Sequence, residues 1–172
     1  MISACQQLQK LIKEKYLKLL FDPILAIVNH GTTCGDYDWS HNQILPTEIR
    51  GYMYELLVEL VLCYKEINDI SHDLLQKTLQ ELVKMILSLI RSNLDDLPSL
   101  SNASVLQLFV EIEFFEITMK DYIMGGSREC LNKIKDLLST NRSIPKQHWN
   151  AEKILLNDAL KATGVQFICF TG

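Results

Sequence analysis

Apolar residues recur at three- and four-residue steps along most of this chain, and this spacing constrains the fold more than any other feature. An α-helix has about 3.6 residues per turn, so the spacing gathers apolar side chains on one helical face. Leucine and isoleucine dominate the apolar set and favour helices over strands. The seven glycines and four prolines are few for a β protein with many turns. The pattern therefore predicts an all-α fold, an antiparallel bundle of about five to six helices in a single domain over residues 1–172.

The helical patterns cover residues 2–28, 46–68, 71–94, 102–124, 128–139 and 150–167. Pro23 disfavours helical geometry in the residue before it, so the first segment is expected to stop or kink near Asp22. Pro46 suits the first turn of the second helix. Ser71 is the expected N-cap of the third helix, and the short link before it predicts that these two helices form an antiparallel hairpin. The fourth helix is expected to start at Ser101 or Asn102. The second helix carries a wide apolar stripe, which predicts a position in the middle of the bundle. The apolar tail at residues 167–170 is expected to dock on the bundle.

Reactive residue types gather in the polar stretch between the first two helices, residues 29–46 (NHGTTCGDYDWSHNQILP). Zinc accepts ligands of the types found at His30, Cys34, Asp36, Asp38 and His41, but no second ligand cluster matches this one. A thiol nucleophile at Cys34 with a base at His30 or His41 is the other chemical reading, but no orienting third group is evident.

The preferred interpretation of this stretch is structural. Aspartate and glycine favour turns, and alternate aromatic residues anchor an irregular link onto a bundle, so Trp39 is expected to be buried. The predicted structural corner comprises Asp22, Pro23, Asp36, Tyr37, Trp39 and Pro46. No catalytic residue, cofactor site or metal site is predicted, and no enzyme activity is expected.

Three glutamates, Glu111, Glu113 and Glu116, form an acidic pattern in the fourth helix. Paired carboxylates serve acid–base chemistry only when a pocket holds them at the right separation. The preferred reading is a solvated acidic strip that is available to a protein partner.

Charge and cysteine usage narrow the class of protein. The net charge of −4 argues against nucleic-acid binding, and the face carrying Lys10, Lys13, Lys15 and Lys18 reads as a solvated helix surface. Five scattered cysteines indicate a reducing compartment, hence a cytoplasmic protein. No apolar run reaches the roughly 18 residues of a membrane-spanning helix, so any membrane contact is expected to be peripheral.

An ordered series of short motifs resembles the exocyst complex component two family. The first part comprises Asp22-Pro23-Ile24, Gly35-Asp36-Tyr37-Asp38-Trp39, Leu45-Pro46, Ile49-Arg50 and Tyr52. The similarity continues through Leu57-Val58 to Tyr64, Glu66-Ile67 and Ile70-Ser71, and then at residues 108–116 (LFVEIEFFE) and 127–131 (SRECL). It covers roughly residues 16–138, and the region it resembles is the carboxyl-terminal one.

The resemblance implies a helical-bundle fragment of a longer, rod-like subunit in a complex that tethers secretory vesicles to the plasma membrane before fusion. The implied partners are other exocyst subunits, and the implied role is a non-catalytic scaffold at exocytic sites. The Ral-binding domain of animal members is not expected in this fragment. The homologous tail of another vesicle-tethering complex is the alternative. The sequence upstream would decide between them, because an exocyst subunit should continue into long coiled helices.

Overall fold

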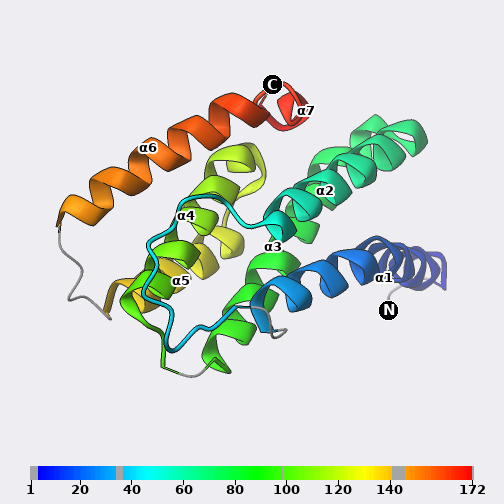
Figure 1. Cartoon of the computed structure of the whole chain (residues 1–172). Helices are drawn as coiled ribbons and strands as arrows, with labels where there is room; N and C mark the ends of the chain where they lie inside the picture. The colour runs from blue at the N-terminus through cyan, green and yellow to red at the C-terminus, as the bar shows by residue number, and fades with distance from the viewer. Residues whose placement is uncertain (1–3, 34–36, 98, 141–145, 172) are drawn as a thin grey trace.

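The computed structural model describes residues 4–33, 37–97, 99–140 and 146–171, and within them it contains helices and no strand (Figure 1). The helices are α1 (Ala4–Thr33), α2 (Gly51–Ile70), α3 (His72–Asp95), α4 (Asn102–Thr118), α5 (Gly126–Thr140), α6 (Lys146–Thr163) and α7 (Ile168–Thr171), with a 3-10 turn η1 (Lys120–Tyr122). The predicted all-α bundle is confirmed. No helix in the described part of the chain is both long enough and apolar enough to cross a bilayer.

Helix α3 contacts more elements than any other helix, because α1, α2, α5 and η1 all pack against it. Its core stripe includes Leu79, Leu82, Val83 and Ile86, which are fully buried. Helix α2, which was expected in the middle of the bundle, packs on α1 and α3 and touches α4. More than one side of α2 is therefore covered, as its wide stripe predicted, but α3 is the central helix.

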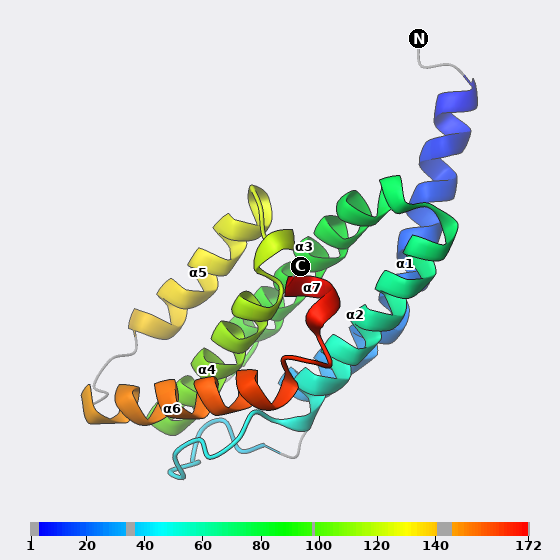
Figure 2. The same cartoon turned by 90° about the horizontal axis from the view of Figure 1, so that it is seen from above.

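Helices α2 and α3 form the predicted antiparallel hairpin, with a single residue between them (Figure 2). Ser71 is extended, with φ −166° and ψ 116°, and its amide donates to the carbonyl of Ile67 at 2.8 Å. Ser71 holds the predicted N-cap position, but its side chain makes no capping hydrogen bond.

The first helix does not stop near Asp22, the first of the two predicted alternatives, since α1 is assigned as one helix from Ala4 to Thr33 with Pro23 inside it. Pro23 has no amide hydrogen to give the carbonyl of Leu19, which costs a helical hydrogen bond. Both Pro23 and Leu19 are exposed, so water can reach that carbonyl. The apolar residues after Pro23 still favour helix because Ile24 and Val28 are completely buried against the bundle.

Helix α2 begins at Gly51, five residues after the predicted start at Pro46. Arg50 is extended, with φ −66° and ψ 148°, and its amide donates to the Glu111 carboxylate at 3.4 Å. A contact with another helix therefore replaces the local capping that the sequence suggested.

In the second half of the chain the predicted helices are present, but α4 ends at Thr118 instead of residue 124 and α6 begins at Lys146 instead of residue 150. Ser101 caps α4, with its hydroxyl accepting from the amide of Ser104 at 3.1 Å. Gly125, whose φ of +52° favours glycine, precedes α5. The apolar tail docks as predicted, because Phe167 and Phe170 are buried and the Phe170 ring contacts Tyr64 and Tyr122.

Candidate functional site

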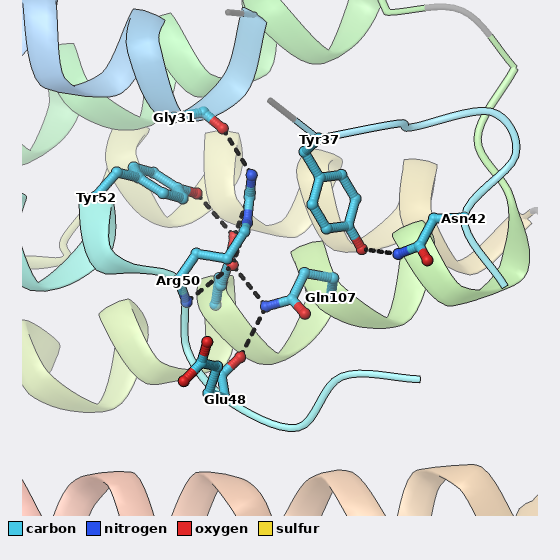
Figure 3. A network of polar contacts seen from close by, with 8 residues as sticks. Gly31, Tyr37, Asn42, Glu48, Arg50, Tyr52 and Gln107 are labelled. Carbon is cyan, nitrogen blue, oxygen red and sulfur yellow. Dashed lines mark hydrogen bonds and ion pairs between the residues drawn. The ribbon is translucent and has the colours of Figure 1, made fainter. Parts of the chain in front are cut away.

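A buried ion pair between Arg50 and Glu111 joins the start of α2 to the middle of α4 (Figure 3). Glu111 is completely buried, and its two oxygens accept from Nε of Arg50 at 2.7 Å and from Nη2 at 2.8 Å. Such bidentate pairs hold both side chains in one geometry. A buried carboxylate needs donors for its remaining lone pairs. Besides Arg50, Glu111 accepts from the hydroxyl of Tyr52 at 2.9 Å and from the side-chain amide of Gln107 at 2.7 Å.

Three aromatic rings surround the guanidinium of Arg50. Its central carbon lies 4.7 Å from the ring centroid of Tyr37, 4.5 Å from that of Trp39 and 4.8 Å from that of Tyr52. Cation–π contacts strengthen when water is excluded. Burial works against the charge of Arg50, but the hydrogen bonds and negative charge of Glu111 outweigh it and raise the pKa of Arg50.

The end of α1 enters the same cluster through Gly31. The carbonyl of Gly31 accepts from Nη1 of Arg50 at 2.9 Å. A Cβ atom on Gly31 would lie only 2.1 Å from two carbons of the Tyr52 ring, so glycine is required for this close approach. Burial, followed by the charge of Glu111, raises the pKa of Tyr52 well above its ordinary value, so its hydroxyl stays a hydrogen-bond donor.

The loop between α1 and α2 is fixed to the bundle by its own hydrogen bonds. The carbonyl of Trp39 accepts from the amide of Ser101, the cap of α4, at 2.9 Å. Within the loop, the side-chain amide of Asn42 donates to the Tyr37 hydroxyl at 2.6 Å. The predicted burial of Trp39 is confirmed, since only 7% of it is exposed.

This arrangement links three helices and a loop, and it leaves little capacity for chemistry. Nε, Nη1 and Nη2 of Arg50 each donate to a protein acceptor, and both oxygens of Glu111 accept from protein donors. A catalytic carboxylate needs a free position for its substrate, and Glu111 is completely buried with both oxygens already accepting. We therefore interpret the Arg50–Glu111 cluster as a structural lock.

The structure changes part of the predicted corner. Asp22 and Pro23 do not belong to it, because both are exposed residues within α1. Pro46 lies in the irregular segment before α2, where it lines a pocket of about 400 Å³ with Tyr37 and Arg50, and does not start the helix. Asp36 lies outside the described residues.

The metal and thiol hypotheses at the corner receive no support from the described side chains. His41 is exposed and its Nδ1 lies 3.2 Å from Oδ1 of Asp38, within a turn that this carboxylate caps. The backbone amide of His41 is the main cause that lowers the pKa of Asp38. Within the described residues, no three His, Cys, Asp or Glu side chains are placed to hold a metal ion. Cys34 lies outside those residues, so metal analysis of the purified protein remains the test.

The predicted acidic strip is wrong for Glu111, which is buried in the lock. Glu113 and Glu116 are half-buried and pair with α5: Lys135 lies 3.5 Å from Glu113 and also binds Glu116, which in addition pairs with Arg128. Burial opposes the charge of Glu116, but Lys135 and then Arg128 outweigh it and lower the pKa of Glu116.

The prediction missed the roles of Gly31, Arg50, Tyr52 and Gln107. One signal for Glu111 was available, because it follows Leu108 by three residues and precedes Phe115 by four. Leu108 and Phe115 are both buried, so this helical spacing places Glu111 on the core face. Gly31 has a packing role, the close contact with Tyr52.

Comparison with known proteins identifies the family. The family described as "Exocyst complex component Sec5" matches residues 1–170. The human protein named "Exocyst complex component 2" is 24% identical over 173 residues, its mouse counterpart is 25% identical over 169, and that of Drosophila melanogaster is 24% identical over 162.

These alignments cover most of the present chain but a small part of each relative. The human and mouse alignments each include 98% of this chain and 18% of the relative, and the Drosophila alignment includes 92% and 17%. No solved structure matches the chain. Because the match extends over nearly the whole sequence, the chain belongs to the exocyst complex component Sec5 family.

Proposed function

We propose that this chain is a non-catalytic scaffold module of the exocyst, which helps to tether secretory vesicles to the plasma membrane before fusion. It would act in the cytoplasm, peripherally at sites of exocytosis, through contacts with other exocyst subunits. Family membership supports the cellular role. The structural lock supports the absence of catalysis, since its polar groups hold helices together.

One observation on the surface carries the scaffold role. The first turns of α1 extend past the α2–α3 hairpin (Figure 2) and expose Leu8, Leu11, Ile12 and Leu19, each more than half exposed. Helical spacing places these four side chains on one face, here called the α1 stripe. Buried residues of α1 such as Leu20 and Ile24 lie on the opposite side. An exposed apolar stripe of this kind is typical of a protein contact.

The charges beside the α1 stripe indicate the chemistry of the partner. Lys15 and Lys18 fall on the same face by helical spacing, and both belong to exposed turns. An apolar stripe with lysines fits an exocyst subunit that presents an apolar helix with flanking acidic residues. Glu113 and Glu116 form a second, weaker candidate surface, because Lys135 and Arg128 already neutralise them within the chain.

A capture experiment tests this proposal. The tagged chain and a Leu11→Glu/Ile12→Glu variant would be used to recover proteins from cell extract, with mass spectrometry to identify exocyst subunits. The control is Val165→Glu, because Val165 is 84% exposed and lies outside the α1 stripe. We expect the original chain and the control to recover exocyst subunits and the α1 variant to lose them. Failure of the original chain to recover any exocyst subunit would overturn the proposal.

A further inference from the structure

Helices α4 and α6 enclose a pocket of about 290 Å³ that lies apart from the Arg50–Glu111 lock. It is lined by Phe109, Val110 and Glu113 from α4 and by Glu152 and Lys153 from α6. Pockets for drug-sized ligands usually measure about 300–1,000 Å³, so this one has room for a side chain more than for a cofactor.

Glu152 is the unusual group in this pocket. Only 7% of the residue is exposed, and its Oε1 has no hydrogen-bond partner within the described structure. Buried polar atoms almost always have a partner, so such an exception calls for an explanation. Burial, followed by the charge of Glu113, raises the pKa of Glu152 to about 8. The described residues therefore leave this carboxyl poorly compensated.

The nearby cations do not provide the missing partner. Lys135 of α5 pairs with Glu113 and Glu116, and its ammonium lies 5.7 Å from the ring centroid of Phe109. Lys153 is exposed, and no ion pair or hydrogen bond joins it to Glu152 among the described side chains. Among the described residues, the pocket thus presents two carboxyl groups, Glu113 and Glu152, beside an apolar wall, with Lys153 in its lining and Lys135 paired to Glu113.

We propose that this pocket binds the guanidinium or ammonium end of a basic side chain from a protein partner. Glu152 supplies the principal acceptor, Glu113 adds negative charge, and Phe109 and Val110 pack against the aliphatic stem of the arriving side chain. The inference deepens the proposed function, on which it rests, because the basic side chain would belong to a partner subunit.

Binding of a cation must change the titration of Glu152. A positive charge beside a carboxyl favours its ionised form, so the bound cation lowers the pKa of Glu152 and releases a proton. Among the described residues, the other charged groups near this carboxyl are Glu113 on α4, Lys153 on α6 and Lys135 on α5 through its pairing with Glu113. The affinity for the cation should therefore rise with pH between about 6 and 8.

The experiment uses n-butylguanidinium chloride as a probe and the neutral n-butylurea as its matched control. The chain is labelled with carbon-13 at its glutamate carboxyl carbons, and each carboxyl is titrated by NMR from pH 5 to 10 at constant ionic strength. Glu152→Gln assigns the signal of Glu152. With saturating n-butylguanidinium we expect the titration midpoint of Glu152 to fall by about one unit or more, and with n-butylurea we expect no shift.

Two outcomes would overturn the inference: an unchanged midpoint with n-butylguanidinium, or an equal change with n-butylurea. As a second measurement, Glu152→Gln should lose the probe-induced shifts at Glu113, while Glu129→Gln at an exposed site of α5 should keep them. If Glu152→Gln fails to fold, sequential backbone and side-chain assignment of the original chain identifies the Glu152 signal, so the titration still decides the matter. The NMR titration requires no exocyst subunit. It can therefore refute binding at the pocket while the capture experiment succeeds, and the capture experiment can fail while the titration supports binding at the pocket.

Discussion

Arg50 and Glu111 are 61 residues apart in the sequence, yet Arg50 donates Nε and Nη2 to the two carboxylate oxygens at 2.7 and 2.8 Å. The pair holds the start of α2 against the middle of α4. Tyr52, Gln107 and the carbonyl of Gly31 complete its hydrogen bonds and bring the end of α1 to the same point. The lock therefore determines how three helices meet at the corner.

Removing one partner of this pair should lower the unfolding free energy far more than removing the charge of both partners. Arg50→Met leaves the Glu111 carboxylate buried without its cation, which should cost about 3–5 kcal/mol of unfolding free energy. Arg50→Met/Glu111→Gln keeps an acceptor for Tyr52 without a buried charge and should be more stable than Arg50→Met alone. Urea denaturation measures the unfolding free energy of Arg50→Met, of Glu111→Gln and of the double variant. A double variant as unstable as the sum of its single substitutions would contradict this account.

Replacing Gly31 should destabilise the chain although alanine is a better helix former than glycine. A Cβ atom on Gly31 would lie 2.1 Å from the Tyr52 ring, and the bond from Tyr52 to Glu111 restrains that ring. Gly31→Ala should therefore cost at least about 1–3 kcal/mol in urea denaturation.

Gly51 provides the control for this substitution, since nothing lies within 4 Å of a Cβ atom placed there. Gly51→Ala should be neutral or stabilise the chain by up to about 1 kcal/mol. Equal effects of the two alanine substitutions would show that Tyr52 yields easily, against the proposed restraint.

The docked tail should contribute to stability through one ring. Phe170 is 1% exposed and packs edge-on against Tyr64 and Tyr122, with ring centroids 5.9 and 6.0 Å away. Phe170→Ala should lower the unfolding free energy by about 3 kcal/mol, because it removes this packing and leaves a cavity. Ile168→Ala should lower the unfolding free energy by no more than about 0.5 kcal/mol, since Ile168 is 65% exposed. Thermal unfolding measures both variants. A tail with no role in stability would give the same small change for both.

Glu152 should make the stability of the chain depend on pH. Its pKa of about 8 in the folded state lies above the ordinary glutamate value of 4.5, so the folded chain retains a proton that the unfolded chain releases. The resulting stabilisation is complete below pH 4.5, declines as the pH rises, and is lost above about pH 8.

Glu152→Met removes this group and should flatten the decline between pH 5 and 8. It should also stabilise the chain at pH 8 by about 1–3 kcal/mol, because the buried oxygen without a partner is gone. Urea denaturation at three pH values checks the expectation, with Glu129→Met as the exposed control. The same pH slope in Glu152→Met as in the original chain would assign the effect to another group.

The sequence by itself determined the fold class, the approximate helices, the α2–α3 hairpin, the start of α4, the burial of Trp39 and the docked tail. These features depend on local conformational preferences and on the periodicity of apolar residues, and both can be read from residues that are close in sequence. The motifs around the corner also indicated the family, which the comparisons confirmed.

Only the tertiary structure decided how the corner works. Pro23 stays within α1 because burial of Ile24 and Val28 outweighs one lost helical hydrogen bond, and α2 starts late because the Arg50 amide meets Glu111. Glu111 looked like a surface residue because its charge suggests exposure, whereas its partner lies 61 residues away. This buried ion pair forms only when distant segments of the chain come together. The residues adjacent in sequence to Arg50 or to Glu111 therefore do not predict it.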